Sequence, residues 1–257
     1  MMEHEVRTAQ QNKRYALLDS YRGFVVLNMI AFHFLYDWYV IFGDNGTWHH
    51  QNGVHLWQQY ICWSFIILSG FVWRYGKRKV WKRGLFLNVM GLVITAVTCV
   101  FIPVEAIWFG ILNFIGCAML LMIPLDKLLQ KVPPLLGMVL SMLVFLLLRD
   151  IGNGNVGIGD TVFFELPDAW YQSYVLVPFG FAPDGFSSSD YFSILPWMLL
   201  YIFGYYFGKW FSGTKVFAKV QGLQIPVLDV IGRNSVWFYM AHQPVCYGIC
   251  LLFQNYY

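Results

Sequence analysis

The sequence has 257 residues, of which 58% are hydrophobic, 19% are aromatic and only 12% are charged. Charged residues make up about a quarter of an ordinary soluble domain. This composition therefore excludes a soluble protein and predicts an integral membrane protein surrounded by membrane lipid. The formal net charge of +3 is too small to indicate a nucleic-acid partner.

Seven segments are apolar enough to cross a bilayer, and each is bounded by charged residues, proline or glycine. They lie near 20–42, 57–75, 83–102, 104–125, 133–149, 192–212 and 233–254. These spans and the short turns between them account for most of the length of the chain. The sequence therefore predicts an all-α bundle of about seven transmembrane helices, folded as a single membrane-embedded domain over residues 1–257.

The first segment carries ionisable residues at a depth where such groups are costly. Counting about 1.5 Å of rise per residue from Gly23 puts His33 roughly 15 Å deep, near the middle of a hydrocarbon core about 30 Å thick. Asp37 follows four residues later, on the same helical face. A histidine oriented by a carboxylate suits general-base catalysis, although a polar pair that only joins helices has the same spacing.

The basic loop RYGKRKVWKR at 74–83 contains no acidic residue, so the positive-inside rule places it in the cytoplasm. Alternation of the spans then predicts a cytoplasmic amino terminus, which carries Arg7, Lys13 and Arg14, and a carboxyl terminus on the outer side. The same loop is also suited to holding the phosphates of a cytoplasmic cofactor.

The outer segment at 43–59 contains His49, His50 and His55. No carboxylate or thiolate stands at ligand spacing among them, so we predict no metal site. We expect these histidines to line the mouth through which an acceptor enters.

A second outer segment, from about 150 to 191, is rich in aromatic residues, and its prolines break any helix. We expect it to fold back as an amphipathic cap or re-entrant lid. Irregular backbone at membrane depth is tolerated only against protein or a water-filled cavity, so the segment predicts a cavity beneath it.

Four blocks, in order along the chain, carry a family resemblance. They are RYALLDSYRGFVVLNMIAFHFLYDW near the start, WFGILNFIG at 108–116, SSSDYFSILPWMLLYIFGYYFG at 187–208 and IGRNSVWFYMAHQP at 231–244. Together they resemble the bacterial proteins related to the catalytic domain of heparan-alpha-glucosaminide N-acetyltransferase. The spacing of Arg22 and His33 is also similar to the Arg and His signature of the wider membrane acyltransferases that acetylate surface polysaccharides.

The resemblance implies transfer of an acyl group from cytoplasmic acetyl-CoA, or another acyl-CoA, to a hydroxyl or amine of a glycan or similar acceptor beyond the membrane. It also implies a protein of the bacterial plasma membrane. The competing hypothesis is a proton-coupled transporter or flippase of a polar solute or lipid-linked sugar, because carriers also use intramembrane His and Asp.

The resemblance leaves two sets of catalytic residues open. The lysosomal enzyme that names the family is similar except that it has Asn at the position matching His33 and uses a histidine of the following loop. The catalytic residues are therefore either His33 with Asp37 or the loop pair His49 and His50.

The remaining site residues are expected on the two substrates. We predict contacts to acyl-CoA from Asp19, Arg22, Asn113, His242 and Gln243, and contacts to the acceptor from Glu105, Asp190 and Trp197. Several of them have structural alternatives. Asp19 and Arg22 also suit an interfacial ion pair, Glu105 suits an interfacial charge, and His242 with Gln243 can satisfy backbone freed by Pro244. Gly204 and Gly208 form a GxxxG pattern that predicts close helix packing.

Overall fold

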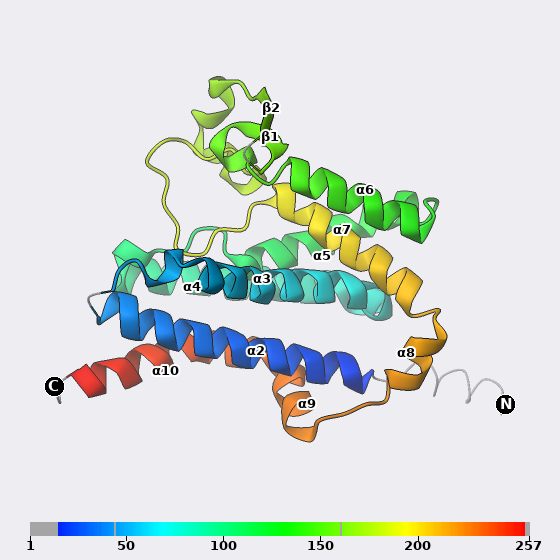
Figure 1. Cartoon of the computed structure of the whole chain (residues 1–257), viewed down its shortest axis with the longest axis horizontal. Helices are drawn as coiled ribbons and strands as arrows, with labels where there is room; N and C mark the ends of the chain where they lie inside the picture. Colours follow the sequence, from blue (N-terminus) through cyan, green and yellow to red (C-terminus); the bar gives the residue numbers. More distant parts are fainter. Residues whose placement is uncertain (1–14, 44, 160, 255–257) are drawn as a thin grey trace. The chain divides into compact units, whose positions relative to one another are not determined.

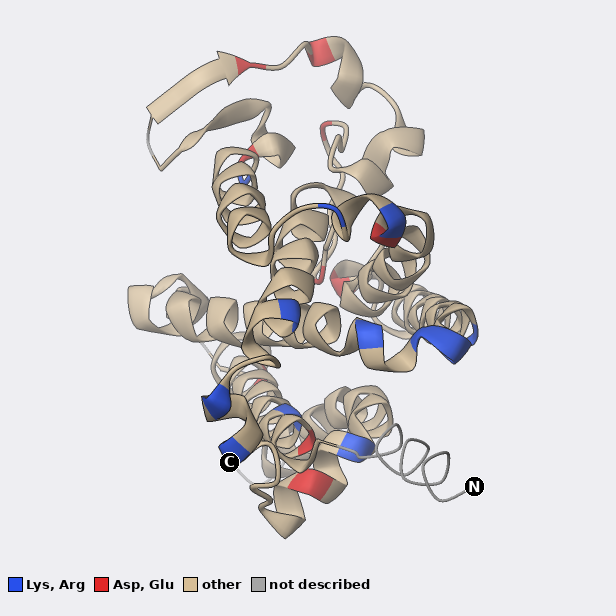
Figure 2. Cartoon of the chain, turned by 90° about the vertical axis from the view of Figure 1, so that its right-hand side faces the viewer, with Lys and Arg blue, Asp and Glu red and all other residues tan. Residues whose placement is uncertain are grey.

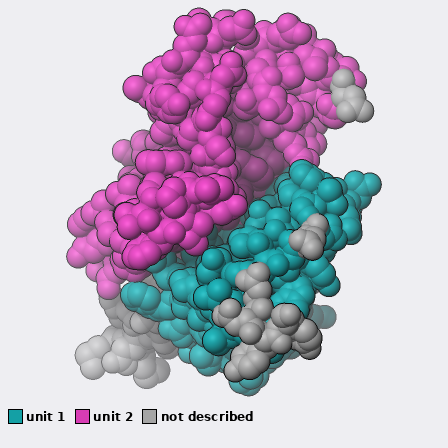
Figure 3. Space-filling view, turned by 90° about the vertical axis from the view of Figure 1, so that its left-hand side faces the viewer, with its two compact units in different colours: residues 1–65, 213–257 teal, residues 66–212 magenta. Residues whose placement is uncertain are grey.

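The structure, a computed structural model, describes residues 15–43, 45–159 and 161–254. Arg7, Lys13 and Arg14, which the sequence predicts to be cytoplasmic, lie outside these residues. The chain divides into two compact units, coloured separately in Figure 3. Unit 1 consists of Met1–Phe65 and Gly213–Tyr257, and unit 2 of Ile66–Ser212. The single membrane-embedded domain stays a prediction.

Within the described residues, a long helix occupies each of the seven predicted spans (Figure 1). These helices are α2 (Ala16–Tyr36), α3 (Asn52–Val72), α4 (Val80–Phe101), α5 (Ile111–Leu129), α6 (Pro134–Leu147), α7 (Ile194–Phe211) and α10 (Ser235–Gln254). The short helices α8 (Lys215–Val220) and α9 (Pro226–Arg233) lie between α7 and α10. The predicted fourth span starts at residue 104, whereas α5 starts at Ile111. The reason is that Pro103–Glu105 forms a separate 3-10 turn and Gly110 is extended.

Five helical stretches of the described chain are long and apolar enough to cross a membrane. They are Ala16–Ile41, Asn52–Phe101, Ile111–Leu129, Pro134–Asn153 and Ser235–Phe253. Asn52–Phe101 contains both α3 and α4, whereas α7 is not in this group because its tyrosines, glycines and lysine lower its mean hydropathy. Few charged residues lie along the long helices (Figure 2). The protein is a helical membrane bundle, as predicted, while the count of seven spans stays a prediction.

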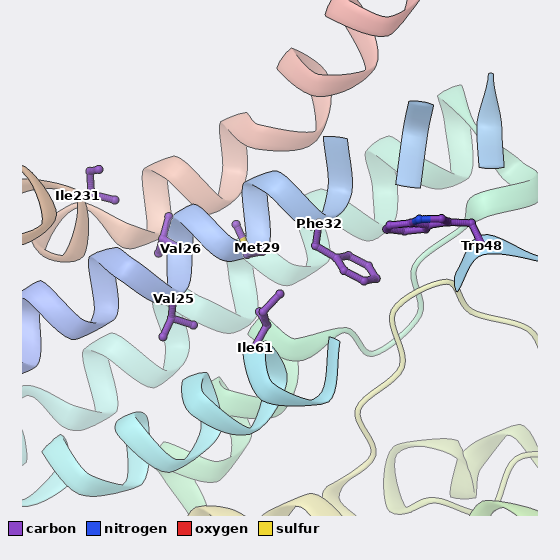
Figure 4. Packing of buried hydrophobic residues seen from close by; sticks show 7 residues of the cluster. All are labelled: Val25, Val26, Met29, Phe32, Trp48, Ile61 and Ile231. Atoms are coloured by element: carbon purple, nitrogen blue, oxygen red, sulfur yellow. The ribbon is translucent and has the colours of Figure 1, made fainter. Parts of the chain in front are cut away.

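In unit 1, one face of α2 forms the centre of a hydrophobic cluster (Figure 4). Residues of this face recur every three or four positions and pack with side chains of α3, α9 and the turn η2 (Trp48–His50). The cluster consists of Val25, Val26, Met29, Phe32, Trp48, Ile61 and Ile231. Because lipid tails are as apolar as these side chains, close packing rather than removal from water holds the helices together.

The close approach of α2 and α9 depends on two glycines. A Cβ atom at Gly23 would overlap the carbonyl of Leu228, and one at Gly232 would overlap the carbonyl of Asp19. The Ser20 hydroxyl also accepts a hydrogen bond of 3.0 Å from the Ile225 N–H, just before α9 begins. Backbone contact therefore fixes α9 across the first turns of α2.

In unit 2, α7 lies against the end of α3. A Cβ atom at Gly204 would overlap the backbone of Ile67, and one at Gly208 would press on Phe71. The close packing predicted from the GxxxG pattern is therefore confirmed.

A polar network lies at the end of α5 in unit 2. The buried carboxylate of Asp126 accepts hydrogen bonds from Lys77 at 2.5 Å, from the Tyr205 hydroxyl at 2.7 Å and from Gln130 at 2.5 Å. A buried carboxylate is costly unless it is paired and hydrogen-bonded. Asp126 thus joins α5 to α7 and to the turn η3 (Trp73–Lys79).

The segment predicted as an outer cap is folded in the structure. It contains an antiparallel hairpin of β1 (Asn155–Ile158) and β2 (Thr161–Glu165), followed by the 3-10 turns η6 (Asp168–Tyr171) and η7 (Tyr174–Phe179). The Tyr191 hydroxyl donates a hydrogen bond to the Val177 carbonyl. Burial raises the pKa of Tyr191 to about 12, so the phenol keeps the proton that it donates. The sequence predicted the folding of this segment but not its hairpin.

Candidate functional site

The His33 ring has a defined tautomer. Its Nδ1 lies 2.9 Å from the carbonyl oxygen of Met29, one turn earlier on α2. A carbonyl can only accept a hydrogen bond, so Nδ1 carries the proton and Nε2 carries the lone pair. A neutral imidazole in this tautomer presents Nε2 as a base.

His242 of α10 lies directly beside His33. The ring centroids are 4.6 Å apart, and the rings meet edge to face at 76°. Nδ1 of His242 lies 2.5 Å from the carbonyl oxygen of Tyr239, which assigns the same tautomer by the same argument. Its Nε2 is buried and has no hydrogen-bond partner among the described residues. The two helices thus bring two imidazoles together, each with its proton on Nδ1 and its lone pair on Nε2.

Asp37 and Gln243 complete the cluster. Asp37 begins a π-helical turn, Asp37–Ile41, at the end of α2, and its side chain is 0% exposed. π-Helical turns are rare in proteins, and those that occur often lie at functional sites. The Asp37 carboxylate accepts a hydrogen bond of 2.9 Å from the Gln243 amide. The structure thus brings together four predicted site residues of unit 1, and the orientation of His33 by Asp37 stays a prediction.

The loop histidines lie beside the end of α2. The rings of His49 and His50 are 3.9 Å apart, and the His49 ring is 5.8 Å from the ring of Tyr36, which precedes Asp37. Burial, and secondarily the neighbouring charge of His50, lower the pKa of His49. His49 is therefore biased toward the neutral form, as a base requires. In the described part of the chain, no group of three or more possible ligands could hold a metal ion.

Asp19 and Arg22 lie at the other end of α2. They form an ion pair of 3.0 Å, and Asp19 is buried. His33 lies eleven positions after Arg22, which corresponds to about 16 Å along the helix. Asp19 and Arg22 thus form the ion pair that was one of the two interpretations of their sequence, and Arg22 is not part of the histidine cluster.

Unit 2 contains a cavity of about 640 Å³ beneath the cap segment. Aromatic residues Trp108, Tyr174 and Phe186 line it, together with the polar side chains of Thr95 and Asn113. This volume is typical of small-molecule sites. The cavity predicted under the cap is present.

The backbone at the rim of this cavity is strained. Phe109, which lines the cavity, has a positive φ of 53°. A positive φ is unusual for a residue other than glycine, and residues with such strained backbone are often found at functional sites. The segment at 188–192 holds it in place, because Ser188 accepts a hydrogen bond of 2.9 Å from the Trp108 N–H and Phe192 donates one of 3.0 Å to the Phe109 carbonyl.

The predicted acceptor residues of unit 2 make structural contacts around this rim. Asp190 accepts a hydrogen bond of 3.1 Å from the Ile111 N–H at the start of α5, and Glu105 accepts one of 2.5 Å from Ser189. Trp197 packs against Phe145 and Phe192 at centroid distances of 5.5 and 4.8 Å. Of the predicted unit 2 residues, Asn113 lines the cavity.

Sequence reasoning missed the carbonyl partners that set both histidine tautomers. Met29 precedes His33 by four residues and Tyr239 precedes His242 by three, and these are the spacings at which a helical side chain meets a carbonyl. That spacing is the signal that could have revealed them.

A family model described as "Heparan-alpha-glucosaminide N-acetyltransferase, catalytic" matches residues 14–244. No curated protein and no solved structure matches the chain. The matched range includes His33 and Asp37 on α2 and His242 and Gln243 on α10, so the whole histidine cluster lies within it. It also includes α5, α7 and the cap segment of unit 2. The chain therefore belongs to the heparan-alpha-glucosaminide N-acetyltransferase catalytic family, which makes it a membrane transferase.

Proposed function

We propose that this protein transfers an acyl group, most simply acetyl, from cytoplasmic acyl-CoA to a hydroxyl or amine of an extracytoplasmic glycan or related acceptor. The observation that carries the proposal is the cluster on α2 and α10, in which His33, with its basic Nε2, lies against His242, and Gln243 beside His242 donates to the buried Asp37 carboxylate. Family membership supports the acetyl group as the one transferred.

The residues present fit a bound acyl-CoA. Gln243 Oε1 is buried and accepts no hydrogen bond from the described residues, so it is available to an N–H of the amide-containing pantetheine arm. Arg22, at the far end of α2, is suited to a phosphate. When bound, acyl-CoA supplies an activated thioester carbonyl.

His33 acts as the general base in this proposal. Its Nε2 accepts the proton of the acceptor hydroxyl or amine as that group attacks the acyl carbon, and the Met29 carbonyl keeps Nδ1 protonated throughout. Asp37 stabilises the imidazolium that forms. His49 and His50 lie beside Tyr36 and take the acceptor side of the site, or carry the chemistry themselves if His33 does not.

The cavity of unit 2 supports a ligand role for Asn113. Aromatic faces combined with hydroxyl and amide groups suit a glycan or the polar arm of a cofactor. Glu105, Asp190 and Trp197 remain proposed acceptor residues, together with their capping and packing roles.

Ligand binding and turnover test the function together. Acetyl-CoA should raise the thermal midpoint of the detergent-solubilised protein, because a ligand at 100 times its Kd stabilises the folded state by about 2.7 kcal/mol. Free CoA should also stabilise the protein but release no further thiol. With acetyl-CoA and an amino sugar or glycan acceptor, acetylated product should appear. No thermal shift at millimolar acetyl-CoA together with no thioester cleavage would instead indicate the carrier.

A further inference from the structure

His242 has a buried basic nitrogen that the helix bundle leaves unused. The residue is 8% exposed, and its Nε2 has no hydrogen-bond partner among the described residues. Buried polar atoms without partners are rare in native proteins, and each one calls for a functional or structural reason. The Tyr239 carbonyl already satisfies Nδ1, so ring orientation is secured without Nε2.

The position of this nitrogen suggests its use. The His242 ring meets the His33 ring at a centroid distance of 4.6 Å, and both Nδ1 protons are donated to helix carbonyls. Each ring can therefore gain or lose a proton only at Nε2. Two imidazolium charges at this separation repel each other, so the pair takes up at most one proton beyond the two on its Nδ1 atoms and titrates as a unit.

The groups around the pair favour a single positive charge. The carboxylate of Asp37 comes from α2, and Gln243, next to His242 on α10, donates to it. The Tyr239 ring lies 5.4 Å from His242, and Phe32 lies 5.8 Å from His33. Asp37 follows His33 by four positions and is hydrogen-bonded to the residue next to His242, so its one negative charge is a counter-charge for one added proton in the cluster.

We propose that His242 is a second base of the site and that it shares one proton with His33 during acyl transfer; this inference rests on the proposed function. The acceptor oxygen or nitrogen forms a bond to the acyl carbon, and its proton passes to Nε2 of His33. The carbon–sulfur bond breaks, and the proton, shared through Nε2 of His242, protonates the thiolate that leaves. One proton is taken up and one is released, so both imidazoles end neutral.

Replacing His242 by an amide residue tests whether its side chain acts as a base or has only a structural role. His242→Asn keeps a hydrogen-bond donor at the position of Nδ1 for the Tyr239 carbonyl but has no basic nitrogen. We expect kcat and kcat/KM to fall together by about 10²-fold, with KM for acetyl-CoA and the thermal midpoint little changed. Gly248→Ala, a change on the same helix where an added Cβ atom meets nothing within 4 Å, should leave kcat, kcat/KM and KM unaltered and should not lower the thermal midpoint.

The outcomes distinguish the two proposals. If the unsubstituted protein transfers no acyl group, the proposed function fails before any variant is compared. If it does transfer one and His242→Asn retains its kcat, the second base is wrong while the transferase stands. If His242→Asn does not fold, His242→Gln, which keeps a polar but non-basic group at the ε position, takes its place.

A measurement on the unsubstituted protein is independent of both variants. Nitrogen-15 NMR of labelled histidine should show His33 and His242 titrating as a coupled pair. Independent titration of the two rings would overturn the shared proton.

Discussion

At the scale of single residues, the candidate site is a small polar region enclosed by apolar helices. Ionisable groups are costly in hydrocarbon and are retained where they do chemistry or transport. Asp37 is fully buried and accepts a hydrogen bond from Gln243, and the neighbouring rings of His33 and His242 both have Nε2 as their unprotonated nitrogen. Nε2 of His242 has no hydrogen-bond donor among the described residues, and an acceptor hydroxyl or amine is a group that can provide one.

Replacing His33 tests its role as the base. His33→Ala should lower acyl transfer by about 10²–10⁴-fold, the contribution expected of a general base that takes a proton in the transition state. Binding of acetyl-CoA, followed by thermal shift, should persist. Asp37→Asn keeps the shape and the Gln243 contact but removes the charge, so it should lower turnover less than His33→Ala does.

The loop histidines provide the contrasting result. Replacing His49 and His50 together should weaken acceptor use and leave slow thioester hydrolysis. An active His33→Ala variant beside an inactive loop variant would move the chemistry to the loop and leave His33 as a structural residue.

The sequence predicted this site in part. Intramembrane position singled out His33 and Asp37, and a matched family block singled out His242 and Gln243. The contact between His33 and His242 could not be predicted, because residues 209 positions apart meet only through the packing of α2 on α10. A helical spacing rule describes neighbours on one helix and carries no information about the partner helix.

Protonation of His49 should make the folded protein sensitive to acid. Its pKa is lowered in the folded state, so near the ordinary histidine pKa the unfolded chain binds more protons. The contribution of His49 to the free energy of unfolding is therefore present above the ordinary histidine pKa and is lost as the pH falls below that value. His49→Gln removes this titration, so its thermal midpoint should fall less between about pH 7.5 and pH 5.5 than that of the unsubstituted protein. His49→Phe should behave like His49→Gln, and an unchanged acid sensitivity in both variants would contradict the assignment.

At the scale of helices, backbone contacts rather than apolar area decide which elements pack. The sequence identified the long helices from apolar runs, but it gave no sign of α9 as a separate element. Residues 226–233 are too few to span a bilayer, and α9 is fixed by the approach of Gly23 and Gly232 to opposing carbonyls. The β1–β2 hairpin was missed for a related reason, since β2 is exposed along its whole length and shows no alternation of apolar and polar side chains.

Gly232→Ala tests the contact between α2 and α9. Its added methyl group would overlap the Asp19 carbonyl, so the helices must separate, and overpacking of this kind costs about 1–3 kcal/mol. We expect a lower thermal midpoint. Gly248→Ala is the matched control on α10, where a Cβ atom meets nothing within 4 Å, and it should not lower the midpoint. Equal midpoints for the two variants would argue against the contact.

At the scale of the whole molecule, the direction of acyl transfer depends on how the chain crosses the membrane. α3 has 21 residues, which at about 1.5 Å each is enough for a hydrocarbon core about 30 Å thick. Its start follows the loop histidines, and its end leads into the basic segment at 74–83. If α3 crosses the membrane, these two ends lie on opposite sides. The basic end then marks the side of the acyl donor, and the end next to the loop histidines marks the side of the acceptor.

Cysteine labelling determines this topology. The native cysteines Cys62, Cys99, Cys117, Cys246 and Cys250 are first replaced by serine or alanine. Asn52→Cys and Lys79→Cys then each place one thiol at an exposed position near either end of α3. In intact cells, a membrane-impermeant maleimide should label the cysteine at 52, whereas the cysteine at 79 should react only after permeabilisation, because basic loops remain in the cytoplasm. Labelling of both positions in intact cells would mean that α3 does not cross. The reverse pattern would place the basic loop outside and require the acyl donor to bind from the outer face.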